Sequence, residues 1–510
     1  MAKTLEGIFR KGWDQYARLN IDGVSHFQKI DNVNLFFKES QNGEFFHLTD
    51  EKVRYEAGLL SASDTKKAKE ECELLNKKFS TVTAKVLYAH QYWKQNKRAD
   101  INIWYLDIEA IDLNNRSFPD TFNPIIPITH IQILDKKSDS IIIFQTKDIS
   151  EEDKLKLKEK YKNDCSKLVF HHIADETIMM KTFIKFLKKI NPTVIVGWNA
   201  ETFDFPYLTA RAEYLGIDIN DFSPLGKTSY KEIHQFGKRQ RMVEWNGIYL
   251  IDLMEAFKKF TFKDQKSYSL EWITKVILKK GQGKMDYGED KSIHNFYKNN
   301  YVGFVDYAVM DVVVLRNIDV KVGLLSLIQT MAEMMGCNYN EVFGTVAPWT
   351  ILLTHLALEK KMVLPPESEY SDHRPIEGGF VKHPIFGLLE WLFSYDYNSL
   401  YPSIQVAFNL SPDTYIKEKD LPPEAIEILR KVNEKEDIFL KDLSYFDEVE
   451  KVCVKYNIEF SGLGFFRVDK QGILPEILEK FYYDRKAEKQ KMLLADAILS
   501  GSKWWNMLSE

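Results

Sequence analysis

Two acidic residues at the end of an apolar strand are the first candidates for chemistry in this sequence. Side chains of residues 101–109 alternate between the two faces of a strand, so Asp107 and Glu109 point to the same side. Burying two adjacent carboxylates is costly unless cations or hydrogen-bond donors compensate their charge. A hard divalent cation prefers such oxygen ligands, and this favours a metal site. The alternative is a solvent-exposed strand end whose acids face water.

Three further candidates lie far along the chain. Asp204 follows residues 192–199, whose pattern indicates a buried strand running into a loop, and strand ends in α/β sheets are where ligands bind. The alternative for Asp204 is a capping role at the helix that follows it. Tyr307 and Asp311 lie within a helical pattern, and their spacing places them on one helix face.

The elements that must position these residues alternate between strands and helices. Strand patterns cover residues 101–109, 125–134 and 140–145, and helix patterns cover 176–190, 207–214 and 301–319. This alternation predicts an α/β layer, in a chain of mixed α/β or α+β class. Before it, a charged helix is expected over residues 62–79, capped by Ser61 or Ser63.

These residues together resemble the three exonuclease motifs of the DEDD superfamily, in its tyrosine subtype. Residue types, order and spacing agree in segments 107–109, 199–204 and 307–311. The resemblance implies an RNase H-like fold and a 3′→5′ proofreading exonuclease in which Tyr307 orients the attacking water. The acids that would hold two Mg²⁺ ions, or Mn²⁺ in their place, are Asp107, Glu109, Asp204 and Asp311.

Segments 251–253, 258–262 and 265–270 narrow the resemblance to the exonuclease domain of family B DNA polymerases of the T-even bacteriophage type. In that family an aromatic at the place of Phe118 stacks on unpaired primer bases, while packing on its own domain is the alternative. A basic hairpin over residues 235–250, turning near Gly237, would help to separate primer from template, although a merely solvated hairpin has the same pattern. The residues expected to contact DNA are Phe118, Asn199, Lys238, Arg239, Arg241, Gly378 and Gly379.

Residues 394–404 resemble the polymerase A motif of family B. The same segment is expected to form a buried strand followed by a turn at Pro402. The resemblance implies that Asp396 binds the polymerase metal ions. Ser399 and Leu400 would offer backbone N–H groups to the triphosphate of a dNTP, and Tyr401 would lie under the sugar and exclude a 2′-hydroxyl.

Two cations on a later helix complete the expected nucleotide site. Arg485 and Lys489 fall where the fingers helix of the family grips the incoming triphosphate. Their i,i+4 spacing places both on one helix face, which suits a polyphosphate. A solvated basic face is the alternative.

The polymerase motifs are incomplete in these residues, because no D-x-D sequence follows Asp396. One palm carboxylate cannot fix the cations of phosphoryl transfer, so the chain is expected not to polymerise alone. It resembles the N-terminal polypeptide of a split phage polymerase whose C-terminal polypeptide supplies the rest of palm, fingers and thumb. An open sheet edge would seek that partner, and Trp504 and Trp505 would suit the interface. The alternatives are a stand-alone 3′→5′ DNA exonuclease and a non-catalytic nucleic-acid-binding scaffold.

Composition sets outer limits on the other properties. The chain has 510 residues, 45% of them hydrophobic, which is enough for about three domains. A net charge of -5 means that primer-template DNA would be held by local basic patches or bound metal rather than by an overall basic surface. Four scattered cysteines and no long apolar run predict a cytoplasmic protein without membrane contact, which could also meet a sliding clamp and other replication proteins.

Domain boundaries follow from these patterns. The expected parts are an N-terminal domain over 1–97 completed by about 321–372, an exonuclease domain over 98–320, a partial palm over 373–475, and the first fingers helix over 476–510.

Overall fold

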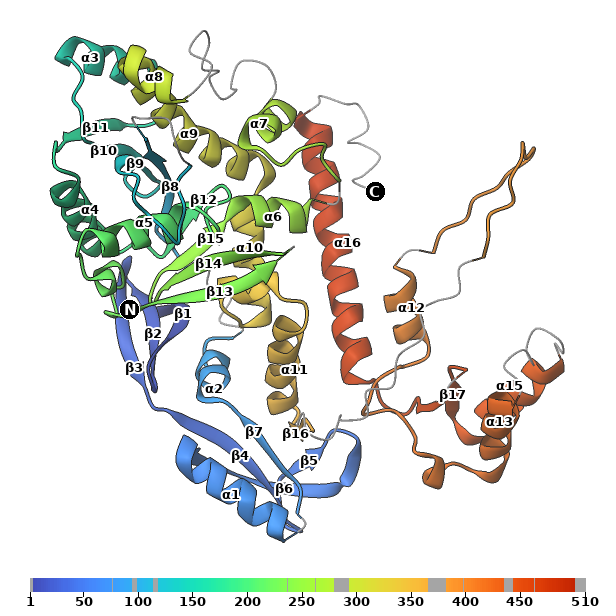
Figure 1. Cartoon of the computed structure of the whole chain (residues 1–510). Coiled ribbons are helices and arrows are strands. Elements are labelled where there is room, and N and C mark those ends of the chain that lie inside the picture. The colour runs from blue at the N-terminus through green and yellow to red at the C-terminus, as the bar shows by residue number, and fades with distance from the viewer. Residues whose placement is uncertain are drawn as a thin grey trace. The chain divides into compact units, whose positions relative to one another are not determined.

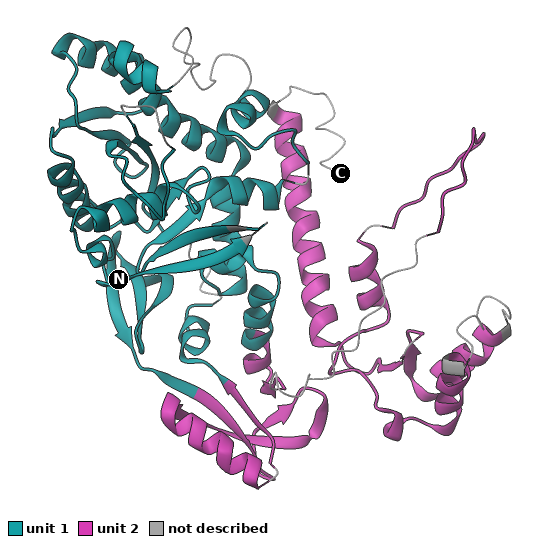
Figure 2. Ribbon diagram, in the orientation of Figure 1, with its two compact units in different colours: residues 1–34, 82–355 teal, residues 35–81, 356–510 magenta. Residues whose placement is uncertain are grey.

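The structure is a computed structural model. It describes residues 3–75, 77–93, 99–112, 118–235, 237–261, 263–278, 293–365, 382–397, 399–434, 444–462 and 464–499. They divide into two compact units (Figure 2), one with Met1–Asn34 and Val82–His355 and the other with Leu35–Thr81 and Leu356–Glu510. Both units contain helices and strands, so the mixed α/β class is confirmed.

A six-stranded sheet forms the centre of the first unit (Figure 1). Its strands are, in spatial order, β11 (Lys167–His172), β10 (Ser140–Gln145), β9 (Ile128–Asp135), β8 (Ile103–Ala110), β12 (Val194–Gly197) and β15 (Tyr249–Asp252). β8 pairs antiparallel with β9 and parallel with β12, and β12 pairs parallel with β15. The strand that carries Asp107 and Glu109 is therefore held on both edges.

Helices cover both faces of this sheet. The side chains of β8 alternate between the two hydrophobic cores that lie on these faces. Tyr105 joins a core with residues of α9 (Tyr301–Val322), whereas Trp104 joins a second core with residues of α4 (Glu176–Ile190) and α5 (Asp204–Tyr214). The other helices of the first unit are α2 (Ala84–His90), α3 (Glu151–Lys160), α6 (Leu253–Phe260), α7 (Leu270–Leu278), α8 (Ile293–Asn299), α10 (Leu324–Met335) and α11 (Ala347–Glu359), which continues past the unit boundary. Within the described residues, no helix has the length and apolar character to cross a membrane.

The first strands of the chain belong to the same unit. β1 (Lys3–Lys11), β2 (Asp14–Ile21) and β3 (Val24–Ile30) form an antiparallel sheet. Arg18 of β2 is fully buried, pairs with Glu6 at 2.7 Å, and donates at 2.6 Å to the carbonyls of Asn191 and Gly247. A buried cation paired in this way ties the small sheet to the loops around the central one. The expected domain boundaries stay a prediction.

The second unit begins with a five-stranded sheet of β16 (Met362–Val363), β5 (Phe45–His47), β6 (Asp50–Ser61), β4 (Val33–Glu39) and β7 (Phe79–Val82), in that order. α1 (Ala62–Leu74) follows β6, and the Ser61 side chain accepts a hydrogen bond from the Asp64 N–H, so Ser61 is the N-cap. The later elements are α12 (Leu400–Ala407), α13 (Pro423–Glu434), α15 (Ser444–Tyr456), β17 (Ile458–Phe460), β18 (Phe465–Arg467) and α16 (Ile473–Leu499).

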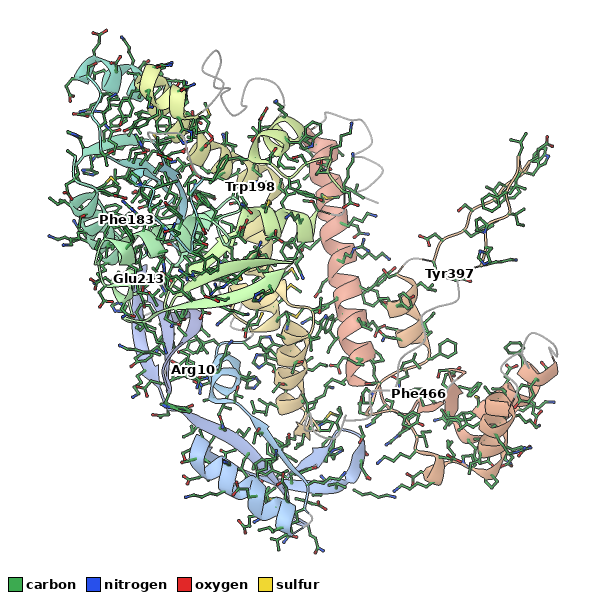
Figure 3. All side chains as sticks on the ribbon, viewed as in Figure 1. Arg10, Phe183, Trp198, Glu213, Tyr397 and Phe466 are labelled. Carbon is green, nitrogen blue, oxygen red and sulfur yellow. The ribbon has the colours of Figure 1, made fainter. Side chains whose placement is uncertain are left out.

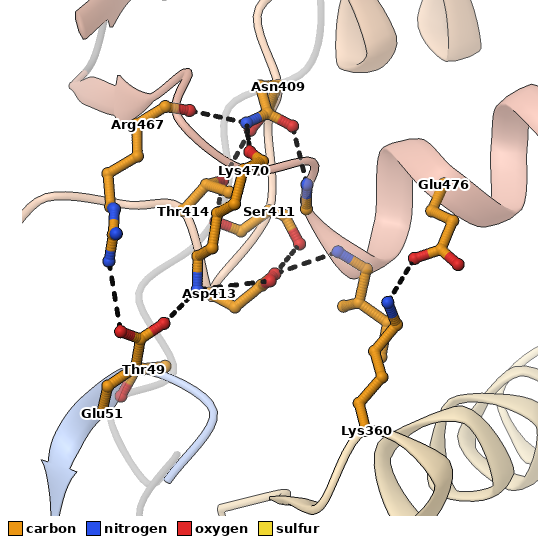
Figure 4. Close-up of polar contacts among 12 residues, drawn as sticks. Thr49, Glu51, Lys360, Asn409, Ser411, Asp413, Thr414, Arg467, Lys470 and Glu476 are labelled. Carbon is orange, nitrogen blue, oxygen red and sulfur yellow. Dashed lines mark hydrogen bonds and ion pairs between the residues drawn. The ribbon is translucent and has the colours of Figure 1, made fainter. Parts of the chain in front are cut away.

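α16 begins at a hydrogen-bonded junction with the segment after α12 (Figure 4). The first N–H groups of a helix have no partner inside it. Here the Gly472 N–H donates to Asn409 at 2.8 Å, and the Ile473 N–H donates to Asp413 at 3.2 Å. These side chains fix the start of the helix relative to the segment that follows the A motif.

The A-motif segment differs from the sequence expectation. Residues 382–397 form no helix or strand, and two extended limbs lead to Tyr397 (Figure 3). The expected buried strand is thus wrong here, and so is a turn at Pro402, which lies in the first turn of α12 after Ser399 in the left-handed region at φ 53°. Proline fits a first turn because its missing N–H is not needed there.

Candidate functional site

Three acids from two distant parts of the chain meet beside the central sheet. Asp107 and Glu109 on β8 and Asp311 on α9 each offer an oxygen, and these atoms lie within 4.8 Å of one another. Glu109 is 7% exposed and Asp311 is 2% exposed. Asp107 is partly exposed, but water compensates the charges of the two buried acids poorly, so the interpretation of this strand end as solvent-exposed is wrong for Glu109.

The meeting follows from how β8 and α9 pack together. The Tyr105 hydroxyl donates to Asp319 at 2.6 Å and links the strand to the far part of the helix. From Tyr105 to Glu109 the strand advances about 13 Å, and from Asp319 back to Asp311 the helix covers about 12 Å. Because the chain direction of α9 is opposite to that of β8, both segments lead from this link toward the same place, and the acids meet there.

Asp204, on a third element, lies near Asp107 but is not among the three acids whose oxygens lie within 4.8 Å of one another. It is the first residue of α5, whose N-cap is Phe203, and its carboxylate accepts a hydrogen bond from the Ile108 N–H at 3.4 Å. Since this bond reaches β8 between the two strand acids, the capping role considered for Asp204 is wrong. Burial and the nearby charge of Asp107 raise the pKa of Asp204 well above its usual value, although the Ile108 N–H opposes the shift.

The loop between β12 and α5 is held by a buried acid for which the sequence suggested no role. Asp252, at the end of β15, accepts hydrogen bonds from the Asn199 N–H at 3.0 Å and the Glu201 N–H at 3.2 Å. Asn199 itself has φ 60°, a left-handed conformation that asparagine tolerates. The register of β12 against β15, which sets Gly197 beside Asp252, could not be read from the sequence.

Gly197 lets this loop approach β8. A Cβ atom on Gly197 would lie 2.4 Å from the Ala200 Cβ and 3.1 Å from the Leu106 carbonyl oxygen. Only glycine permits so close an approach without a shift of the backbone. The contact therefore holds the start of the loop that leads to Asp204 close to β8.

Tyr307 lies one turn before Asp311 on α9, as its spacing predicts, and is 2% exposed. Its ring packs against Phe296 and Phe304, with centroids 6.5 and 6.4 Å away. These contacts leave the ring little freedom, so the direction of its hydroxyl is set by the helix.

The donor set fits a hard divalent cation. All ligand atoms offered by Asp107, Glu109 and Asp311 are carboxylate oxygens, which Mg²⁺ and Mn²⁺ prefer. Bringing like charges together in a poorly solvated place favours protonation unless a cation binds. Among the described residues this grouping of acids is the one found, and Asp396 is not part of it.

The residues expected to contact DNA occupy different surroundings. Phe118 is 89% exposed, so it does not pack on its own domain. In the hairpin of β13 (Thr228–Gln235) and β14 (Lys238–Trp245), Arg239 and Arg241 lie 4.4 and 4.5 Å from the Phe122 ring centroid. Arg241 also donates to the Thr121 carbonyl at 3.1 Å, and Arg239 pairs with Glu232 at 2.7 Å.

Both arginines therefore fix the hairpin to the segment that carries Phe118, an interaction that the sequence did not reveal. The hairpin turns at Gly237, as expected, but starts at Thr228 rather than near residue 235. The Lys238 side chain, Gly378 and Gly379 lie outside the described part of the structure.

The polymerase-motif residues are exposed on the second unit. Asp396 lies in the extended segment, Leu400 and Tyr401 are 44% and 78% exposed, and Ser399 precedes α12. Arg485 and Lys489 are exposed on α16, on one face as their spacing predicts. Around Asp396 the apolar residues are also exposed, including Trp391 at 88% and Tyr395 at 91%.

Comparisons with known proteins agree with these motifs. A family model described as "DNA polymerase family B, exonuclease domain" matches residues 58–273, and one described as "DNA polymerase family B" matches residues 347–498. The first match contains Asp107, Glu109 and Asp204 and ends before Asp311.

Similar curated proteins are DNA-directed DNA polymerases of two phages and an archaeal enzyme. The polymerase of Escherichia phage RB69 is 27% identical over 332 residues, which are 64% of this chain and 34% of the phage protein. That of Enterobacteria phage T4 is 24% identical, with the same shares of 64% and 34%. DNA polymerase 1 of Pyrococcus abyssi is 30% identical over 49% of this chain and 33% of its own length. The chain spans about a third of the length of these relatives.

Proposed function

Because the chain belongs to the family B DNA polymerases, with the exonuclease domain and part of the polymerase domain, we propose that its acid cluster is a 3′→5′ exonuclease site acting on DNA. The observation that carries the proposal is the meeting of Asp107, Glu109 and Asp311, with ligand atoms within 4.8 Å. Bringing acids of two distant segments together in a largely buried place is costly unless a cation compensates their charge.

Each residue of the cluster has a role in removing a terminal nucleotide. Asp107, Glu109 and Asp311 would hold Mg²⁺, and Asp204 would complete the set from α5. Two Mg²⁺ ions would supply an activated water and stabilise the charge on the leaving 3′ oxygen. Tyr307 would orient that water, because a phenol is protonated at neutral pH and both donates and accepts hydrogen bonds.

The test compares two substitutions on one helix. Asp311→Asn should lower Mg²⁺-dependent digestion of a 3′-labelled single strand on the order of 100-fold, because it removes a ligand charge. Asp306→Asn is the matched control on α9, since Asp306 pairs with Lys160 at 2.6 Å outside the cluster. Wild-type protein that shows no metal-dependent digestion, or equal losses in the two variants, would refute the proposal.

The exposed A-motif segment favours a second role, in which this chain is one part of a split DNA polymerase. Between Ile385 and Tyr397 most large apolar side chains are exposed, Leu388 to 96% and Phe393 to 75%. Exposed apolar segments of this kind are typical of surfaces that another polypeptide covers. We propose that a second chain with the remaining palm, fingers and thumb packs there and completes the site of Asp396.

In that complex Ser399, Leu400 and Tyr401 would bind the dNTP together with Arg485 and Lys489. Co-expression with such a C-terminal family B polypeptide should give a stable complex that extends a primer. Asp396→Asn should abolish extension and leave digestion intact. A failure to form the complex, or extension that survives Asp396→Asn, would remove this second role without touching the first.

A further inference from the structure

One neutral side chain lies directly against the acid cluster and has no role so far. In the antiparallel pairing of β8 with β9, Gln132 is the partner of Asp107. Gln132 is fully buried, and its Nε2 donates to Asp107 Oδ2 at 2.6 Å. Hydrogen bonds to a charged acceptor are stronger than those between neutral groups, so this one restrains the carboxylate.

The next cross-strand partner is also uncharged. His130 pairs with Glu109, is fully buried, and has its Nε2 3.0 Å from the Tyr301 hydroxyl. Burial lowers the pKa of His130 to about 3, so its ring is neutral at pH 7. β9 therefore faces both strand acids with neutral groups.

The charge of the partner matters for a site of this kind. A lysine or arginine opposite Asp107 would hold the carboxylate but would compensate the charge that attracts a metal ion. An amide N–H fixes the direction of the carboxylate and leaves its charge in place. The amide therefore restrains the Asp107 carboxylate without placing a positive charge beside it.

The oxygen of the Gln132 amide also favours a role beside the acid cluster. Gln132 Oε1 is buried and has no hydrogen-bond partner among the described residues. It belongs to the same planar group as the nitrogen that donates to Asp107, so this acceptor also lies beside the cluster. Buried polar atoms usually have partners, and an acceptor without one beside a cluster of acids is a place where a water can bind.

We infer that Gln132 is a positioning residue of the nuclease centre: its amide N–H orients the Asp107 carboxylate for metal binding, and its Oε1 accepts a hydrogen bond from water held there. This inference rests on the proposed exonuclease function. Groups that orient metal ligands commonly change metal affinity 10- to 100-fold when removed, although they never touch the metal.

The test measures metal binding rather than digestion. Gln132→Met keeps the size of the side chain and removes both polar atoms. Free Mn²⁺, followed by electron paramagnetic resonance during titration of the full chain, should show binding about tenfold weaker or more than in the wild type. The melting temperature in EDTA, which reports the fold alone, should move much less than the metal affinity.

A matched control lies on the neighbouring strand. Gln145 of β10 is also fully buried, donates from Nε2 to an aspartate, Asp148, at 3.3 Å, and has an Oε1 without a partner among the described residues. Asp148 is not in the cluster, so Gln145→Met should bind Mn²⁺ like the wild type. If Gln132→Met does not fold, Gln132→Ala removes the same amide without crowding, and the same weakening is expected.

The outcomes separate the inference from the function beneath it. Wild-type affinity in the Gln132 variant, or equal weakening in the Gln145 variant, would overturn the positioning role. Wild-type protein that binds Mn²⁺ no better than Asp107→Ala would instead overturn the exonuclease site itself.

Discussion

Phe118 offers the sharpest test of how this chain would hold a DNA end. Its side chain is 89% exposed, so Phe118→Ala removes almost no contact from the fold, and stability should change by less than about 0.5 kcal/mol. Stacking of a base on an aromatic ring is worth about 1–3 kcal/mol, so affinity for a single strand should fall about 5- to 150-fold. Fluorescence anisotropy with a labelled oligonucleotide, in an Asp311→Asn background and with EDTA to prevent digestion, measures this loss.

Phe122 supplies the contrast within the same segment. Its ring lies under the Arg239 and Arg241 guanidinium groups at 4.4 and 4.5 Å, so Phe122→Ala should lower the free energy of unfolding by about 1–3 kcal/mol. Its effect on DNA affinity should be the smaller of the two, because it acts only through the position of the segment. Unchanged affinity in Phe118→Ala, or destabilisation equal to that of Phe122→Ala, would refute the stacking role.

Two further predictions concern the loop between β12 and α5. Burial, Asp252 and Glu255 raise the pKa of Glu201 from 4.5 to about 7. The free energy of unfolding should therefore fall as the pH rises from 4.5 to about 7. Glu201→Gln should be about 2–3 kcal/mol more stable than the wild type at pH 8 but not at pH 4. Denaturant unfolding in EDTA checks this, and a difference independent of pH would contradict it. Gly197→Ala should cost about 1–3 kcal/mol and slow digestion, because the new Cβ lies 2.4 Å from the Ala200 Cβ. An unchanged melting temperature would show that the loop relaxes without moving Asp204.

Local patterns were sufficient for several elements and for the face on which each acid lies. The strand at Ser140–Gln145 and the helix at Glu176–Ile190 have the bounds that β-rich composition and the helical pattern predicted. Period-two alternation placed Asp107 and Glu109 on one face, and helical spacing paired Tyr307 with Asp311. These inferences need only the geometry of one element, which the order of residues encodes directly.

The partners of those acids depended on tertiary structure. Gln132 pairs with Asp107, and Asp252 accepts hydrogen bonds from the loop before Asp204. Two arginine side chains lie against the Phe122 ring. No local pattern indicates these contacts. The A-motif segment shows that a local pattern can also mislead. Its apolar residues predicted a buried strand, but Trp391 and Tyr395 are exposed. A sequence determines which face of an element a residue occupies. The register and packing that bring two such faces together depend on contacts across the whole fold, and only the folded chain decides them.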